Sequence, residues 1–527
     1  MSDAAGTRTG IRSAHLVAAG IFLSRIAGLV REIVAAGYLG TSAVASVFRV
    51  ALRLPNILQN LLGEGTLSAS FIPVYSKLLE EGREEEAGRV AGGIFALLCA
   101  VAGALVLIGI FLAPALVRIF VPGYATRPEL FELTTSAVRI VFPMTGLLVL
   151  SAWALGILNS HRRFFVPYVA PVLWNAAIIA TLIAFGGRLD PAGLVKALAW
   201  GALVGGALQF GIQLPWVFAL ERALRIGWHT RLAGVREVVR NAGPAILGRG
   251  SVQLSGWIDL ILISFLWAGA ASVVGYAQTF YLLPISLFGM SVAAAELPEL
   301  SRLYGDPHDA LRARLSAGLR QIAFLVTPTL VGYIVLGDVI VAGLLQRGDF
   351  VSADTLIVHL TLAGFSIGLL AATSSRLYNS TFFALRDTKT PARIALLRVV
   401  LNAALGAALM IPLERVALQG RPLGVVGLAV GAGIASWVEW GLLRRSLRAK
   451  IGEFGAGAGK LARMVGAALP AALLARGIVA LLPAQPPLLV AAIVLPLYGT
   501  LYFAGAYLLG LEEVALVLGR FGRRLRR

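Results

Sequence analysis

The stretch FLSRIAGLVREIVAAGYLG (residues 22–40) has the length and apolar character of a membrane helix, yet it carries charges in its middle. The next apolar stretch, VASVFRVALRLPNILQNLLGEG (residues 44–65), does the same. The charged and amide side chains in these two stretches include Arg25, Arg31, Glu32, Arg49, Arg53, Asn56, Asn60 and Glu64. If residues 44–65 form one helix, the last five fall within about 80° of one another. The sequence therefore predicts one polar stripe on an otherwise apolar helix.

A membrane location makes these charges unfavourable. Each arginine at a bilayer centre costs about 2.5–3.5 kcal/mol, so four that face lipid would cost about 10 kcal/mol. We therefore expect them to face a wet cavity lined by protein, and an arginine-rich cavity suits an anion. The alternative is structural: the arginines reach the headgroups, or they pair with Glu32 and Glu64. Arg25 and Glu32, seven residues apart, share a helix face and are spaced for one such pair.

The composition is that of a polytopic helical membrane protein. Of the 527 residues, 58% are hydrophobic and 14% are charged, and Cys99 is the single cysteine. One cysteine excludes a disulfide framework and a cysteine-based metal site. The formal net charge of +19 does not indicate nucleic-acid binding, because the charges lie in short loops between apolar runs. We expect no cleaved signal peptide, and the first apolar run to act as an uncleaved insertion signal.

Apolar runs predict an all-α fold with fourteen transmembrane helices. They cover residues 14–38, 43–76, 90–120, 132–158, 167–186, 191–220, 240–267, 270–299, 313–345, 354–383, 391–413, 422–443, 461–482 and 487–511. Lysine and arginine are concentrated in alternate loops, so both termini are expected to be cytoplasmic.

These spans predict seven parts of the chain. They are a cytoplasmic N-terminus (1–13), an N-lobe of six helices (14–221), a cytoplasmic linker (222–239), a C-lobe of six helices (240–443), a Gly-rich basic linker (444–460), a C-terminal helix pair (461–511) and a basic cytoplasmic tail (512–527).

An internal repeat supports two pseudo-symmetric lobes. Gly40 precedes Pro55 by fifteen residues, and Gly269 precedes Pro284 by the same spacing. Downstream, FIPVYSKLL is echoed by ELPELSRLY. Two six-helix halves in parallel order, about 225–230 residues apart, are typical of an alternating-access transporter.

The second lobe has fewer charges in its spans. Ser251, Ser255 and Asp259 recur every four residues, which predicts a polar stripe ending in a carboxylate. Asp259 is a candidate cation or proton site, and its alternative role is to bond serine or backbone groups. Asn402 is a weaker companion whose simpler role is packing. We expect no metal site, because the histidines lack ligand spacing, and GEFGAGAGK (452–460) fails the phosphate-loop pattern.

The chain resembles the MurJ/MviN lipid II flippases of the MOP exporter superfamily over nearly all its length, including two extra C-terminal helices. The stretches that carry the resemblance are SRIAGLVREIVAAGYLG, RLPNILQNLLGEGTLSASFIPVYSKLL, ALGILNSHRRFFVPYVAPVLWN, NAGPAILG, LLQRGDF and ALRDTKTPAR. Charged residues common in the family are replaced here at Ser46, Gln59, Asn60, Thr279 and Leu282.

The resemblance implies a MATE-like fold and a transporter rather than an enzyme, in the bacterial cytoplasmic (inner) membrane. The implied substrate is lipid II, the undecaprenyl-diphosphate-linked peptidoglycan precursor, moved from the inner to the outer leaflet. The family's cavity residues correspond here to Arg25, Arg31, Arg53 and Asn56, with Glu64 in a matching Glu-Gly pair. Spacing alone adds Arg49 and Asn60.

No cofactor and no catalytic residue is expected. The candidate energy sources are a Na⁺ or H⁺ gradient coupled near Asp259, the membrane potential, or consumption of the product outside. The expected partners are lipid II, membrane lipids and the peptidoglycan synthesis machinery, without nucleic acid. Two alternatives stay open: a flippase for another polyprenyl-diphosphate-linked glycan, and a non-transporting scaffold that binds the lipid precursor.

Overall fold

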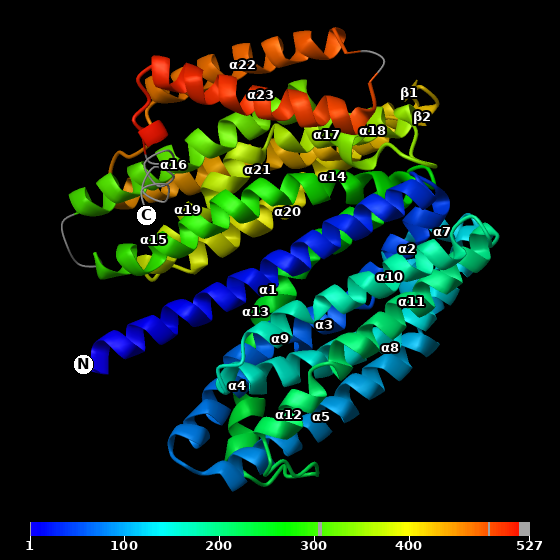
Figure 1. Cartoon of the computed structure of the whole chain (residues 1–527), viewed down its shortest axis with the longest axis vertical. Helices are drawn as coiled ribbons and strands as arrows, with labels where there is room; N and C mark the ends of the chain where they lie inside the picture. The colour runs from blue at the N-terminus through cyan, green and yellow to red at the C-terminus, as the bar shows by residue number, and fades with distance from the viewer. Residues whose placement is uncertain (1, 304–307, 483–484, 516–527) are drawn as a thin grey trace. The chain divides into compact units, whose positions relative to one another are not determined.

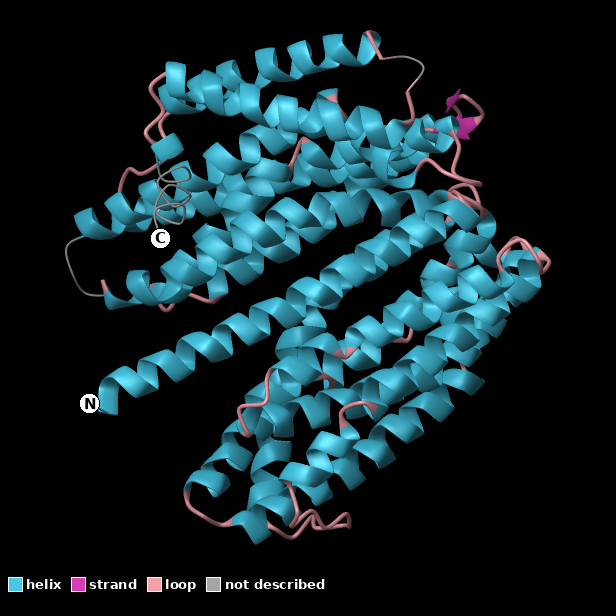
Figure 2. Cartoon of the chain, viewed as in Figure 1, coloured by secondary structure: helices cyan, strands magenta, loops and turns pink. Residues whose placement is uncertain are grey.

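The structure is a computed structural model that describes residues 2–303, 308–482 and 485–515, without the side chains of 2–16, 18, 57 and 247–255. It forms two compact units, Met1–Ser272 and Val273–Arg527. Nearly all of the described chain is helical (Figure 2), and its one sheet is the short pair β1 (Ala417–Leu418) and β2 (Arg421–Pro422).

The first unit consists of helices and short connections. They are α1 (Ser2–Leu39), α2 (Ala43–Arg53), α3 (Asn56–Leu62), α4 (Glu64–Glu80), α5 (Glu84–Phe111), α6 (Ala113–Phe120), α7 (Pro122–Ala125), α8 (Pro128–Ser160), α9 (Phe165–Val169), α10 (Pro171–Phe185), α11 (Pro191–Gly211), α12 (Leu214–Leu220) and α13 (Ala233–Ser264). In this unit α8 packs against α5 and α11, and α10 lies beside α11 (Figure 1).

Helix ends in this unit follow sequence signals. The Ser42 hydroxyl caps α2 by accepting from the Ala45 amide at 3.3 Å. Asp190 caps α11 by accepting from the Gly193 amide at 3.3 Å, and Pro191 occupies the first turn, where no amide donor is needed.

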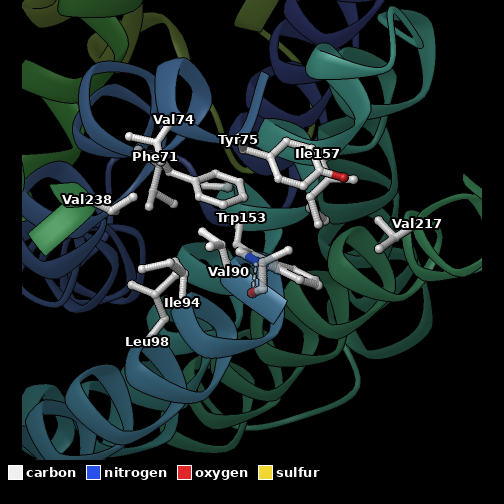
Figure 3. Close-up of a cluster of buried hydrophobic side chains, with 14 of the residues drawn as sticks. Phe71, Val74, Tyr75, Val90, Ile94, Leu98, Trp153, Ile157, Val217 and Val238 are labelled. Atoms are coloured by element: carbon white, nitrogen blue, oxygen red, sulfur yellow. Dashed lines mark hydrogen bonds between the residues drawn. The ribbon is translucent and has the colours of Figure 1, made fainter. Parts of the chain in front are cut away.

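Large apolar side chains, mainly from α4, α5 and α8 with valines of α12 and α13, form a core cluster of the first unit (Figure 3). The labelled members are Phe71, Val74, Tyr75, Val90, Ile94, Leu98, Trp153, Ile157, Val217 and Val238. Trp153 is 1% exposed, and its indole N–H donates to the Ala91 carbonyl at 3.0 Å, drawn as the dashed line. This bond satisfies the indole donor inside an apolar cluster.

A polar cluster closes one edge of this core. The Tyr75 hydroxyl donates to the Glu221 carboxylate and lies 2.9 Å from Nε2 of His161. His161 follows the end of α8. Burial lowers the pKa of its imidazole, and the negative charges of Glu221 and Glu84 partly offset this by raising it. The cluster therefore ties α4, the end of α8 and the end of α12 together.

Two glycines let the segment after α12 approach α5 closely. A β-carbon at Gly88 would lie 2.3 Å from the Ala223 carbonyl oxygen, and one at Gly92 would lie 1.9 Å from that of Arg225. The Arg225 amide also donates to the Gly88 carbonyl at 3.5 Å. Side chains at these positions would push the segment away from the helix.

The second unit is also helical, and α14 begins just before its boundary. Its elements, besides the sheet, are α14 (Ala270–Pro284), the π-helix η1 (Ile285–Met290), α15 (Ser291–Arg302), α16 (His308–Val335), α17 (Gly337–Leu345), α18 (Ser352–Ser366), α19 (Leu369–Ala384), α20 (Lys389–Glu414), α21 (Gly424–Ile451), α22 (Ala458–Ala480) and α23 (Pro487–Leu508). Within this unit α22 and α23 run side by side, and α20 packs along α21 (Figure 1).

Tyrosines of α23 hold the C-terminal pair against a proline in α16. Pro328 has no amide to bond the carbonyl of Phe324, four residues earlier. The Tyr502 hydroxyl donates to that carbonyl at 2.7 Å, and Tyr498 donates to the Pro328 carbonyl at 2.6 Å. The helix defect thus becomes a docking point for α23.

A buried ion pair fixes the hairpin between α20 and α21. The strands pair antiparallel, Ala417 with Pro422 and Leu418 with Arg421. The Arg421 guanidinium lies 2.7 Å from the Asp354 carboxylate at the start of α18. Asp354 is fully buried, so its charge requires such a partner.

All fourteen predicted spans fall on helices, but the count of fourteen spans is not established. Among the described residues, ten helices are long and apolar enough to cross a membrane, or eleven with the bent pair α18–α19. The remaining three predicted spans correspond to α1, the broken series α2–α4, and α13. These are the segments that carry the predicted cavity charges.

Several predicted boundaries differ from the structure. Helix α1 starts at Ser2, inside the predicted N-terminal segment, and α13 starts within the predicted linker 222–239. Helix α21 continues to Ile451, inside the predicted linker 444–460. The unit boundary follows Ser272, because α13 packs against α4, whereas the sequence placed the C-lobe from residue 240. Most of the predicted tail, 516–527, lies outside the described residues.

The close approach of the segment after α12 to α5 predicts that one added methyl group at Gly92 lowers the stability of the protein. Gly92→Ala should lower the thermal unfolding temperature of the purified protein, since overpacking costs about 1–3 kcal/mol. The control is Gly103→Ala on the same helix, where an added β-carbon meets nothing within 4 Å. Alanine favours a helix over glycine by about 1 kcal/mol, so the control should hold or raise that temperature. Equal temperatures for the two variants would contradict the packing described.

Candidate functional site

A buried carboxylate joins the arginines of α1 and α2. Glu32 is 8% exposed, and its Oε1 lies 2.7 Å from Nη2 of Arg31. Its other oxygen accepts from Arg49. The Arg31 guanidinium also lies 4.9 Å from the centre of the Trp174 ring. One carboxylate therefore serves two arginines, and the group keeps one net positive charge.

The sequence placed Glu32 on the same face as Arg25, and the structure pairs it differently. A long arginine side chain reaches along and between helices, so Arg31 and Arg49 both reach Glu32. Arg25 instead lies on an exposed part of α1. In this conformation Arg31 and Arg49 thus pair with a glutamate, as the alternative interpretation of the sequence proposed. Their part in anion binding stays a prediction.

The polar stripe is not on one helix, as the sequence assumed. The segment from Ala43 to Glu80 breaks at Leu54–Pro55 and again at Gly63. Pro55 has no amide for the helix ladder, and Gly63 adopts an extended conformation with ψ −151°. Arg49 and Arg53 lie on α2, Asn56 and Asn60 on α3, and Glu64 opens α4. The helical-wheel angle therefore holds for neighbours within each piece only.

Two adjoining cavities in the first unit collect part of the predicted set. The larger, of 590 Å³, is lined by Gln59, Asn60, Glu64, Gly65, Ser68 and Ala69. The smaller, of 280 Å³, is lined by residues that include Arg25, Gln59, Glu64, Ser151, Tyr168 and Gln209. Gln59 and Glu64 line both cavities, so the cavities meet at the break between α3 and α4. Arg25, Asn60 and Glu64 are thus brought to one polar space.

Arg53 has a carboxylate neighbour that the sequence did not pair with it. Arg53 is exposed at the end of α2, and Asp259 of α13 acts on it electrostatically. Asp259 is half-buried, and Asn56 is half-buried at the start of α3. Asp259 therefore lies within electrostatic reach of a predicted cavity arginine of its own unit. The side chains of Ser251 and Ser255, its predicted companions, lie outside the described residues.

Asn402, the other candidate for ion coupling, lies in the second unit on α20 and is 7% exposed. The sequence had already given packing as its simpler role. Among the described residues no group of three His, Cys, Asp or Glu side chains could hold a metal ion.

Sequence reasoning missed three polar residues of α3, α8 and α11. Gln59 lines both cavities, although it was noted only as a departure from the family. Ser151 lines the smaller cavity and accepts from Gln213 at 2.6 Å, and Gln209 lines it too. The signal was present, since Ser151 and Gln209 are polar residues inside apolar spans.

A charged cluster in the second unit was also missed. Arg398 of α20 and Glu439 of α21 form an ion pair of 3.3 Å, and Arg376 of α19 acts electrostatically on Glu439. Thr279, where the family often has a charge, bonds the Gly275 carbonyl of its own helix at 3.0 Å. The second unit therefore also has charged side chains within its long helices.

The second unit has a further cavity of 210 Å³ with mainly apolar walls. Its lining includes Trp437, Trp440 and Arg444 of α21 and Leu461 of α22. The Arg444 guanidinium stacks 5.1 Å from the centre of the Trp440 ring. This cavity suits an apolar chain better than a charged headgroup.

Arg25 gives the smaller cavity of the first unit a cationic side chain. Arginine is always charged and binds phosphate oxygens through two parallel bonds. The rest of the described lining includes amides, hydroxyls and the carboxylate of Glu64.

The chain matches proteins of one family over most of its length. A family model described as "Lipid II flippase MurJ" matches residues 35–500. The "Lipid II flippase MurJ" of Burkholderia cenocepacia is 31% identical over 85% of this chain and 86% of its own. The "Probable lipid II flippase MurJ" of Bdellovibrio bacteriovorus is 29% identical over 96% of each chain.

Solved structures show the same fold. One described as "Lipid II flippase MurJ, inward closed conformation" has a TM-score of 0.72 at 22% identity, covering 97% of this chain and all of that one. An inward-facing multidrug resistance MATE family transporter of the MOP superfamily has a TM-score of 0.65 at 18% identity, covering 81% and 94%.

The geometry predicts that substitutions of two glutamates differ in their effect on stability. Glu32→Gln leaves Arg31 and Arg49 without their shared charge, and removing one partner of a buried pair costs about 3–5 kcal/mol. The unfolding temperature in detergent should therefore fall clearly. Glu64→Gln changes an exposed cavity residue, and its effect on stability should be smaller than that of Glu32→Gln. Equal stability of the two variants would contradict the structural role of Glu32.

Proposed function

Because the chain belongs to the lipid II flippase MurJ family, we propose that it moves lipid II from the inner to the outer leaflet of the bacterial cytoplasmic membrane. Lipid II carries a peptidoglycan building block on a polyprenyl diphosphate, so this step supplies peptidoglycan biosynthesis. The observation that carries the proposal beyond family membership is the polar space of the first unit, where Arg25 and Glu64 line one cavity and Asn60 and Glu64 line the adjoining one.

The diphosphate is the part of this substrate that the arginines recognise. Arg25 and Arg53 are exposed and meet the headgroup first. Arg31 and Arg49 bind Glu32 in this conformation, so a diphosphate must compete with that carboxylate to engage them. Charge-assisted hydrogen bonds contribute about 1.5–3 kcal/mol each, enough for several together to hold a dianion reversibly.

Alternating access moves the headgroup without covalent chemistry. Two units that exchange between inward-open and outward-open arrangements expose the cavity to each side in turn. The polar lining described above keeps the headgroup solvated, while the polyprenyl chain stays in an apolar environment. The tryptophan-lined cavity near α22 and the pair α22–α23 are the candidate path for that chain.

In this proposal the protein is a transporter and not an enzyme, with both termini in the cytoplasm. It works beside the machinery that polymerises peptidoglycan, which consumes the translocated precursor. The basic residues concentrated in alternate loops support the orientation.

Complementation tests the proposal directly. In cells depleted of their own lipid II flippase, the wild-type chain should restore growth, whereas Arg25→Ala and Arg53→Ala should fail at matched membrane levels. The control is Arg188→Ala, which removes an exposed charge from the loop before α11 and should restore growth.

Other outcomes would change the conclusion. Failure of a well-expressed wild-type chain would favour a different polyprenyl-diphosphate glycan as substrate. Rescue by all variants alike would keep the function and contradict the account of the cavity.

Asp259 is the proposed coupling residue, through a Na⁺ or H⁺ gradient or the membrane potential. Its position near Arg53 supports this role, because a cation that neutralises Asp259 changes the charge balance around Arg53. Asp259→Asn should therefore abolish the response of lipid II transport to imposed ion gradients in vesicles. A response equal to wild type would remove Asp259 from the coupling mechanism.

A further inference from the structure

The second unit contains more positive than negative charge among three of its membrane helices. Arg398 lies nine residues into α20, about 14 Å from its start, and Glu439 lies twelve residues before the end of α21, about 18 Å from it. Arg376 lies eight residues before the end of α19, about 12 Å away. All three are therefore at depths where lipid exposure of a charge is unfavourable.

The ion pair in this cluster is loose. Nε of Arg398 lies 3.3 Å from Glu439, yet it makes no aligned hydrogen bond in the described part of the chain. The Arg398 side chain is 35% exposed, against 12% for Glu439. The guanidinium thus keeps donors available to a second acceptor.

Arg376 lies on the accessible stripe of a helix that is otherwise buried. Most of α19 is buried, and its exposed residues are Arg376 and Phe383, seven positions apart on one face. No ion pair of Arg376 occurs among the described residues, although Glu439 lies within its electrostatic reach. Asn379, one turn on, has an unsatisfied side-chain oxygen. An arginine that faces lipid is costly, which favours contact of Arg376 with water or a polar ligand.

Tyr281 of α14 completes the cluster. It lies within electrostatic reach of Arg376, Arg398 and Glu439. Its hydroxyl can donate a hydrogen bond to an oxygen anion, as the arginines can. Two arginines and a phenol around one carboxylate leave an excess of donors and one excess positive charge.

From this geometry we infer that Arg376 and Arg398 form a second anion-binding site, in the second unit, for a phosphate-bearing ligand. Glu439 is its built-in counter-ion and competes with the ligand for Arg398. Resting on the proposed function, the inference names the diphosphate of the lipid substrate as the first ligand to consider, and a free inorganic anion shares the same chemistry.

The test measures anion affinity of the full-length protein in phosphatidylcholine nanodiscs, in buffer free of phosphate. The probes are inorganic pyrophosphate and undecaprenyl diphosphate. An Arg25→Ala/Arg53→Ala background removes the exposed arginines of the first unit, so that the remaining binding reports on the second.

Opposite shifts are expected for two substitutions. Arg376→Gln should weaken binding by about ten-fold or more, since it removes a charge-assisted contact. Glu439→Gln should tighten binding by about three-fold or more, because it frees Arg398 and raises the positive charge of the site. Arg393→Gln, an exposed residue on the same helix as Arg398, should leave the affinity unchanged. Unfolding temperatures verify that each variant is folded.

Unchanged affinity in both Arg376→Gln and Glu439→Gln, with lowered unfolding temperatures, would overturn the inference and leave the cluster a structural one. Equal binding of both probes would support the site and assign it to free anions, whereas selective binding of undecaprenyl diphosphate would assign it to the lipid headgroup. If the wild-type chain fails complementation while the two variants still shift the anion affinity in opposite directions, the second site is supported and the proposed function is contradicted.

Discussion

The ionic contact of Glu32 with Arg31 and Arg49 is the constraint on which the first unit depends. Charges within a membrane protein need partners, and here one carboxylate of α1 neutralises an arginine of its own helix and one of α2. The contact fixes how α1 and α2 meet and so where the exposed arginines lie. Arg25 lines the smaller cavity and Arg53 is exposed at the end of α2, and neither forms an ion pair with Glu32 in the described part of the chain.

Hydropathy located the helices correctly but could not describe their interruptions. Pro55 and Gly63 were visible in the sequence, yet a run of apolar residues reads as one span whether or not the backbone continues. The break decides the site, since both cavities of the first unit meet beside Gly63. The predicted span boundaries differ from the helix ends where a helix continues beyond its apolar run, as α21 does to Ile451.

Pairing of charges was the least predictable part of the site. Spacing along one helix suggested Arg25 as the ion-pair partner of Glu32. Such spacing contains no information on which neighbouring helix supplies a partner. Asp259 and Arg53 are far apart in the sequence and meet only through the packing of α13 in the first unit. Arg376, Arg398 and Glu439 lie on three separate helices, α19, α20 and α21, so no single stretch of sequence shows that they form a cluster.

The ion contacts also constrain how the chain enters the membrane during synthesis. Arg49 follows Glu32 by seventeen residues, so α1 and α2 can partition into the bilayer as one hairpin in which Glu32 already contacts Arg31 and Arg49. Arg53 differs, because Asp259 is synthesised 206 residues later. Until α13 arrives, the end of α2 holds a cation without that carboxylate, at a cost of about 2.5–3.5 kcal/mol if it faces lipid. Biogenesis of the first unit is therefore a cooperative event that α13 completes.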